Sequence, residues 1–151
     1  MQVSLEDYSI LIVEDNTDDV LLIKRAFQQC GVVNPLRFVT DGEQAVAYLK
    51  GTGEFGDRKK NPLPVLILLD LKMPRMNGFE FLRWLRNEPD LKKIIVVILT
   101  SSSESPDINR AYELGANSYL VKPVRFEDLI RIVKELHLYW LIMNEKPDIK
   151  G

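Results

Sequence analysis

Five short apolar runs, each followed by a segment with helical periodicity, restrict the fold of this chain more than any other feature. The strongest run, Ile94–Leu99, is six aliphatic residues long. Continuous apolar runs, as opposed to alternating ones, indicate strands that are buried on both faces. Because strands and helices alternate five times, we expect an α/β sandwich of three layers. A parallel sheet with right-handed crossovers would be covered by helices on both sides.

Polar and glycine-rich breaks set the boundaries of these elements. Asp41-Gly42 and Ser105-Pro106 are typical helix starts, the second with proline at the first helical position. We expect strands at 9–13, 35–39, 64–70, 94–99 and 118–121. We expect helices from the polar cluster 14–18 to residue 30, and at 42–50, 78–87, 105–114 and 125–143.

Length and charge exclude several classes of protein. The 151 residues suit one domain, which we place at 7–143, with an N-terminal tail at 1–6 and a C-terminal tail at 144–151. The net charge of −2 argues against nucleic-acid binding. The chain has a single cysteine, Cys30, no signal peptide, and no apolar run near the ~18 residues of a membrane span. We therefore expect a cytoplasmic protein.

Unusual polar residues follow four of the five expected strands. They are Glu14-Asp15 after the first strand, Asp70 after the third, Thr100-Ser101 after the fourth and Lys122-Pro123 after the fifth. The carboxyl ends of parallel strands lie at one edge of the sheet, where ligand sites of open α/β sheets form. We therefore expect these side chains to converge.

Such a cluster suits phosphoryl chemistry with a divalent cation. Three carboxylates at close range repel one another, and a hard cation such as Mg²⁺ relieves that repulsion through oxygen ligands. Lys122 adds a compact positive charge for a carboxylate or a phosphoryl oxygen. Asp70 is central among these ends, so we expect it to be the nucleophile.

Four stretches resemble the receiver domains of bacterial two-component response regulators. They are ILIVEDN (10–16), LILLDLKMPRMNGFEFL (66–82), VVILTSS (96–102) and GANSYLVKP (115–123). The resemblance covers about residues 7–143. It implies a single flavodoxin- or CheY-like, doubly wound (βα)5 domain with strand order 2-1-3-4-5.

The resemblance also implies a role for individual residues. Asp70 would be the phosphoacceptor, and Mg²⁺ would be held by Glu14, Asp15, Asp70 and the backbone carbonyl of Lys72. The residues that bind the phosphoryl group and act as the switch would be Thr100, Ser101, Lys122 and Tyr119. Pro123 would follow a cis peptide bond, and Gly78 would permit a tight turn below the site.

In function, the chain would be a phosphoacceptor switch and not an enzyme in its own right. A sensor histidine kinase would supply the phosphoryl group, and output would be a change in protein–protein interaction. The loop at 51–62, the segment 86–102 and the aromatic C-terminal extension are similar to stand-alone regulators paired with cyanobacterial phytochrome kinases. That subgroup implies a phytochrome-type kinase as one possible donor.

The end of the last helix is apolar nearly all the way round. Leu138, Leu141 and Ile142 have no obvious core to enter, so we expect a homodimer that uses this helix and its neighbours. The alternative is a tail that folds back on its own domain. His137, the only histidine, lies in this core-like helix and lacks the context of a phosphorelay residue.

Three other functions compete with this interpretation. A phosphatase of the haloacid dehalogenase type would need an acid two residues after Asp70, where this chain has Lys72. A flavodoxin-like cofactor binder would need small residues after the first strand, where EDNTDD is acidic. A degenerate receiver would bind partners without phosphorylation, although all the site residues are present here.

Overall fold

The computed structural model describes residues 8–149 as one parallel five-stranded sheet in the order β2-β1-β3-β4-β5. This is the expected flavodoxin-like or CheY-like topology. The strands are β1 Ile10–Val13, β2 Leu36–Val39, β3 Leu66–Leu69, β4 Ile95–Thr100 and β5 Ser118–Val121. The α-helices are α1 Thr17–Gln29, α2 Gly42–Lys50, α3 Gly78–Arg86, α4 Ser105–Glu113 and α5 Phe126–Leu136. A short 3-10 helix, η2, covers Gly53–Phe55.

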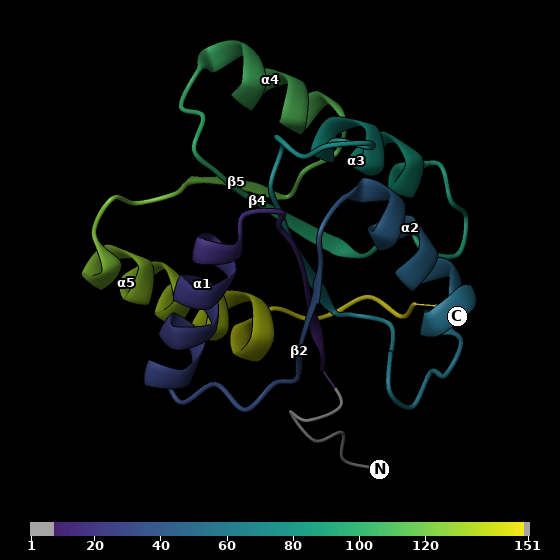
Figure 1. The fold of residues 1–151 in the computed structure, drawn as a ribbon, viewed down its shortest axis with the longest axis horizontal. Coiled ribbons are helices and arrows are strands. Elements are labelled where there is room, and N and C mark those ends of the chain that lie inside the picture. The colour runs from purple at the N-terminus through teal and green to yellow at the C-terminus, as the bar shows by residue number, and fades with distance from the viewer. Residues whose placement is uncertain (1–7, 150–151) are drawn as a thin grey trace.

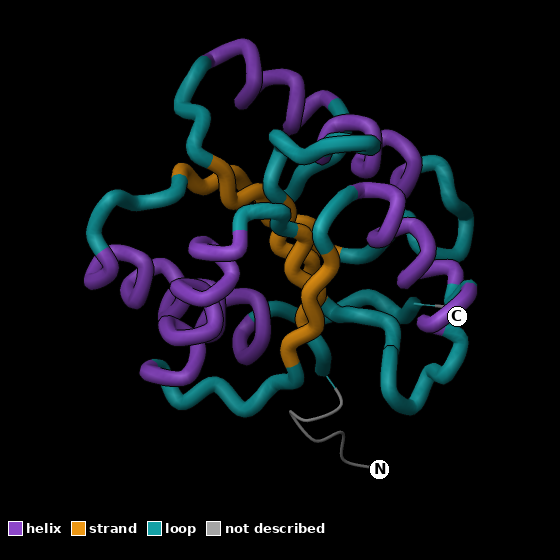
Figure 2. Tube along the Cα trace, in the orientation of Figure 1, coloured by secondary structure: helices purple, strands orange, loops and turns teal. Residues whose placement is uncertain are grey.

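The helices form two layers, one on each face of the sheet. Figure 1 shows α1 and α5 together on one side and α2, α3 and α4 on the other, and Figure 2 shows the strands between them. Alternate residues of β3 enter different clusters: Leu66 and Leu68 pack toward α1 and α5, whereas Ile67 and Leu69 pack toward the other layer. This alternation explains why the central strands are apolar at every position.

Side-chain caps fix where the helices begin. Asn77 and Glu80 form a capping box at α3, in which each side chain accepts a hydrogen bond from the other residue's backbone N–H. The Asp41 carboxylate caps α2 by accepting from the Gln44 N–H at 2.8 Å. Both caps lie beside the carboxyl edge of the sheet, so they also anchor the loops that line that edge.

The last helix differs from its predicted form. The α-helix ends at Leu136, and a π-helix, η3, continues over His137–Met143. Leu141, expected to be exposed, is buried in the cluster beneath α1 and α5. Leu138 and Ile142 are each 53% exposed, as expected. The wider turn of a π-helix changes which residues share a face, so α-helical spacing mispredicts Leu141.

The segment after η3 was predicted to be a loose tail from residue 144. In the structure it leaves the α5 layer and runs to the opposite layer (Figure 1). There Ile149 packs against the cluster beneath α2, α3 and α4. On the way, Lys146 Nζ lies 4.9 Å from the centroid of the Tyr8 ring. The predicted N-terminal tail, residues 1–6, lies outside the described residues.

No helix among residues 8–149 is both long enough and apolar enough to cross a membrane.

Arg86, at the end of α3, joins three parts of the chain. Its guanidinium donates to the carbonyl oxygens of Lys92 and Ile94 at 2.7 Å and of Gly115 at 2.9 Å, and to Asn117 Oδ1 at 2.9 Å. Burial lowers the pKa of this guanidinium. These contacts join α3 to the connections that lead into β4 and β5. Two of the four predicted polar strand ends, Thr100-Ser101 and Lys122-Pro123, follow these strands.

We predict that Arg86→Met lowers the free energy of unfolding by about 2–4 kcal/mol, because it leaves several partly buried carbonyls without donors. Urea denaturation monitored by circular dichroism measures the change. Arg83→Met is the matched control on the exposed side of the same helix and should change stability by about 0.5 kcal/mol or less. Equal losses in the two variants would refute a structural role for the Arg86 contacts.

Candidate functional site

The polar residues predicted to converge do meet at the carboxyl edge of the sheet. Glu14, Asp15 and Asp70 each offer a carboxylate oxygen, and these oxygens lie within 4.8 Å of one another. Glu14 is 2% exposed and Asp70 is 6% exposed, whereas Asp15 faces solvent. The three residues follow β1 and β3, which are paired in the sheet. Such a donor set fits a hard divalent cation reached from the solvent side.

Asp70 is held by hydrogen bonds on one oxygen and by a charge on the other. Its Oδ1 accepts from Thr100 Oγ1 at 2.6 Å and from the Leu71 backbone N–H at 2.8 Å. Its Oδ2 lies 3.5 Å from Lys122 Nζ. Thr100 is fully buried at the end of β4, the neighbour of β3. The carboxylate is therefore fixed in direction, and Oδ2 is left for chemistry.

Lys122 stands at the centre of the negative charges. Its Nζ lies 2.5 Å from Glu14 Oε1 and 2.8 Å from Asp19 Oδ2, in addition to the Asp70 contact. Burial lowers the pKa of Lys122, but the hydrogen bonds to Asp19 and Glu14 and the charge of Asp70 outweigh it and raise the pKa above its usual value. Lys122 is thus a permanent cation at neutral pH.

Asp19 is a residue of the site that the sequence reasoning missed. It lies in the first turn of α1, where an acidic residue is ordinarily explained by the helix dipole. A signal was nevertheless present. Asp19 precedes the buried Ile23 by four residues, so it shares the face of α1 that packs on the sheet.

The environment of Glu14 opposes its ionisation. Burial, reinforced by the charge of Asp70, raises the pKa of Glu14 to about 7, although Lys122 and the Asn16 N–H both favour the charged form. Ionising Glu14 costs free energy because its carboxylate is removed from water and lies beside another carboxylate. A cation bound between Glu14 and Asp70 would remove that cost, which is a second reason why the site fits a metal.

Tyr119 and Ser101, both predicted switch residues, differ in their surroundings. The Tyr119 hydroxyl donates to the Ser102 backbone carbonyl at 2.8 Å, so the ring is held inward against the β4–α4 connection. Burial raises the pKa of Tyr119. Ser101 is exposed, whereas Ser102 is buried and donates to Asp107 Oδ2 at 2.5 Å. Ser102, not predicted from sequence, is therefore the residue that links Tyr119 to α4.

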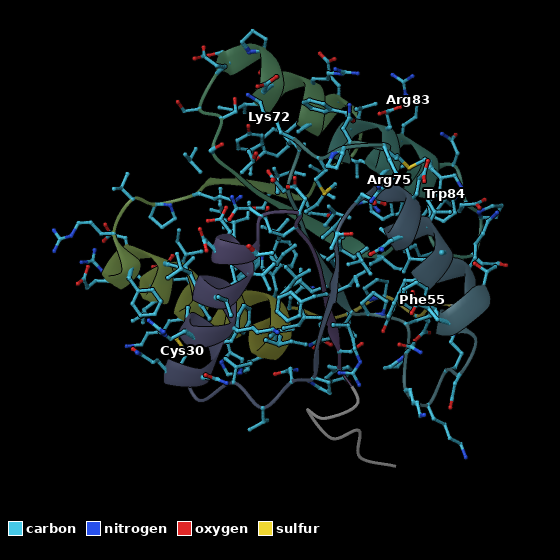
Figure 3. All side chains as sticks on the ribbon, in the orientation of Figure 1. Cys30, Phe55, Lys72, Arg75, Arg83 and Trp84 are labelled. Atoms are coloured by element: carbon cyan, nitrogen blue, oxygen red, sulfur yellow. The ribbon has the colours of Figure 1, made fainter. Side chains whose placement is uncertain are left out.

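The loop between β3 and α3 is held in place from two sides. Arg75, which has a positive φ of 63°, forms an ion pair with the buried Asp41 at the start of α2. The Gly42 N–H donates to the Met76 carbonyl at 2.8 Å. Figure 3 shows Lys72 and Arg75 on this loop, with Arg75 beside α2. The side chain of Lys72 is exposed.

Gly78 closes the loop at a point where no side chain fits. Its N–H donates to the Leu71 carbonyl at 3.0 Å. A Cβ on Gly78 would lie 2.8 Å from Leu71 Cα and even closer to the Asp70 carbonyl oxygen. The predicted need for glycine thus has a clear reason, which is close backbone approach below Asp70.

The predicted cis bond before Pro123 is wrong, because no peptide bond within residues 8–149 is cis. The trans form is the more stable one for proline by roughly 0.5–1 kcal/mol.

Comparison with known proteins agrees with this geometry. The response regulator receiver domain family matches residues 10–134. Over 142 residues the chain is 42% identical to the probable methanogenesis regulatory protein FilR2 of Methanothrix harundinacea, covering 94% of this chain and 89% of that protein. Over 132 residues it is 38% identical to response regulator Rcp1 of Synechocystis, covering 87% and 88%.

Two solved structures are also similar. The phosphorylated cyanobacterial phytochrome response regulator RcpA superimposes with a TM-score of 0.86 at 37% identity, covering 93% of this chain and 99% of that one. The Mn²⁺-bound form of Rcp1 gives a TM-score of 0.83 at 36% identity, with the same coverage of both chains.

The strand order and the acidic edge define an α/β protein of the CheY-like class. Its family follows from the match over most of its length. The chain belongs to the response regulator receiver domains of two-component systems.

The raised pKa of Glu14 leads to a pH prediction. The folded state holds the Glu14 proton more tightly than the unfolded state does. The contribution of protonated Glu14 to stability is therefore fully present below about pH 4.5 and is lost as the pH rises toward 7. We therefore predict that wild type loses stability relative to Glu14→Gln as the pH rises from about 4.5 to 7. Urea denaturation in EDTA measures the difference. The control is the same measurement in saturating Mg²⁺. A bound cation favours ionised Glu14, so the stability difference should then depend less on pH. A difference independent of pH in EDTA would contradict the assignment.

Proposed function

We propose that this chain is a phosphoacceptor switch that takes a phosphoryl group from a histidine kinase onto Asp70. The observation that carries the proposal is the position of Asp70 Oδ2, 3.5 Å from Lys122 Nζ, while Oδ1 is held by Thr100 at 2.6 Å. A buried carboxylate with one fixed oxygen and one oxygen facing a cation is oriented for attack on phosphorus.

In the proposed reaction, Asp70 Oδ2 attacks the phosphorus of a phosphohistidine. A P–O bond forms to Asp70 as the P–N bond of the donor breaks, and the donor imidazole leaves with the electron pair of that bond. Lys122 would place positive charge beside the phosphoryl oxygens, and Thr100 Oγ1 would turn from Asp70 to donate to one of them. The product is an acyl phosphate on Asp70.

The proposed cofactor is Mg²⁺. Glu14, Asp15, Asp70 and the backbone carbonyl of Lys72 would hold it, which is supported by the grouping of the three carboxylates and by the anchored β3–α3 loop. When bound, the cation supplies charge neutralisation for the incoming phosphoryl group. The Mn²⁺-bound form of Rcp1 shows that a similar chain binds a divalent cation.

The switch would travel from Thr100 and Lys122 to the surface formed by α4, β5 and α5. When Thr100 moves toward the phosphoryl group, the space beside it opens. Tyr119, already turned inward with its hydroxyl on the Ser102 carbonyl, would move together with the β4–α4 connection as Thr100 shifts. The added charge thereby changes a protein-binding surface, which is how phosphorylation commonly acts on a switch.

The donor would be a sensor histidine kinase, and this chain would act in the cytoplasm. A phytochrome-type kinase is one candidate donor, supported by the similarity to Rcp1 and RcpA. FilR2, a relative at higher identity, is instead described as a methanogenesis regulator. The identity of the input therefore has to come from phosphotransfer measurements against candidate kinases.

We predict that wild type gains one phosphoryl group when incubated with acetyl phosphate and Mg²⁺, and that Asp70→Asn gains none. Intact mass spectrometry measures both. Asp90→Asn, an exposed aspartate outside the site, is the matched control and should label like wild type. Lys122→Ala should still be labelled but should fail to change partner affinity. Labelling of Asp70→Asn at the wild-type rate would show that Asp70 is not the acceptor.

A homodimer is the second part of the proposal. Four apolar side chains of η3 remain exposed, namely Leu138, Tyr139, Ile142 and Met143. Tyr139 borders a hollow that is also lined by Leu120, Ile132 and Trp140. An apolar patch of this kind, next to the edge strand β5, is typical of an interface between subunits.

We predict that wild type sediments as a dimer at about tens of micromolar, a range in which interfaces of ordinary size associate. Ile142→Glu should sediment as a monomer, because it places a charge in the patch. Leu21→Glu is the matched control, since Leu21 is an exposed aliphatic residue on α1, outside the patch. Analytical ultracentrifugation separates these outcomes, and a monomeric wild type would rule out the dimer.

A further inference from the structure

Asp19 contacts the ammonium group of Lys122 but stands apart from the metal-binding group. Three carboxylates surround Lys122 Nζ, at 2.5 Å (Glu14), 2.8 Å (Asp19) and 3.5 Å (Asp70). Glu14 and Asp70 belong to the group that could hold a cation, whereas Asp19 does not. Its contact with Lys122 therefore needs an explanation of its own.

Asp19 is held in this position by the start of α1. Asn16 caps the helix by accepting from the Asp19 backbone N–H at 2.9 Å. The Asp19 side chain, 33% exposed, reaches Lys122 beside a small cavity of about 40 Å³ walled by Leu22, Leu99 and Leu129. An ion pair against an apolar wall is screened less than one in open water.

We propose that Asp19 is a positioning residue that holds Lys122 in the unphosphorylated protein and competes with the phosphoryl group for its ammonium. This inference rests on the proposed phosphorylation of Asp70. It identifies Asp19, on α1, as the residue that sets how strongly the site retains a phosphoryl group.

The competition follows from where Lys122 is held. Its Nζ lies 2.8 Å from Asp19 Oδ2 and 3.5 Å from Asp70 Oδ2. A cation bound to Glu14 and Asp70 would draw those two carboxylates toward itself, leaving Asp19 as the anion that Lys122 keeps. A phosphoryl group on Asp70 would then attract the Lys122 ammonium away from Asp19, and the attraction lost to Asp19 is subtracted from the stability of the phosphorylated state.

The experiment measures how tightly beryllofluoride, a phosphoryl mimic, binds in saturating Mg²⁺, by fluorine NMR. Asp19→Asn keeps the backbone N–H that Asn16 accepts and removes only the charge. We expect it to bind beryllofluoride roughly 1.5- to fivefold more tightly than wild type, the range of a partly exposed ion pair. Asp19→Glu keeps the carboxylate and should return the affinity to near the wild-type value.

Asp18→Asn is the matched control. Asp18 is the exposed neighbour in the same helical turn, so its loss changes the net charge and the helix N-terminus equally. We expect unchanged beryllofluoride affinity for Asp18→Asn, and Mg²⁺ affinities that agree between the two variants. The inference would be overturned if Asp18→Asn and Asp19→Asn gained beryllofluoride affinity equally, or if Mg²⁺ affinity rose as much as beryllofluoride affinity. Either result would show that the effect comes from the change in net charge.

The outcomes also separate this inference from the proposed function. A folded wild type that neither binds beryllofluoride nor becomes labelled on Asp70 would refute both. A wild type that does both, with Asp19→Asn indistinguishable from it, would refute only the role of Asp19.

Discussion

The charge balance around Lys122 is the interaction on which the rest of the structure depends. Glu14 and Asp70 are almost completely buried, and a buried carboxylate pair needs a neighbouring cation to balance its charge. Lys122 supplies that cation from the far end of the sheet, two strands away from Asp70. The parallel order of the apolar strands and the caps of α1 and α2 bring this one ammonium among carboxylates that are distant in sequence.

The frame around this cluster is rigid where the chemistry needs it to be. The β3–α3 loop is held by the Arg75–Asp41 ion pair and by the close approach of Gly78 to Leu71. On the other side, Arg86 fixes the connections that lead into β4 and β5. The proposed switch residues, Thr100, Lys122 and Tyr119, are held instead by hydrogen bonds and ion pairs, which can be exchanged for others. A fixed frame with a few exchangeable polar contacts is what a two-state switch requires.

Much of this could be predicted from the sequence, for a physical reason. Parallel strands bring their carboxyl ends to one edge, so Glu14, Asp70, Thr100 and Lys122 were predictable together once the strands were recognised. Asp19 was not, because an acid in the first turn of a helix already has an ordinary explanation. Leu141 and Ile149 were mispredicted because a π-helix and a crossing terminal segment have no periodic signal. The trans bond before Pro123 depends on an energy difference too small to read from sequence.

The crossing of the C-terminal segment brings residue 146 beside the start of the described chain. Lys146 lies over the ring of Tyr8, which comes just before the interior strand β1. Residues 8 and 146 are therefore neighbours, and a short linker between them would join the chain into a ring. Circular permutation is tolerated when ends are adjacent and the new break falls in an exposed connection, such as the loop at 51–62. The order of the elements along the chain can thus change while the sheet they form stays the same. A permuted chain that starts in that loop would form the same polar edge.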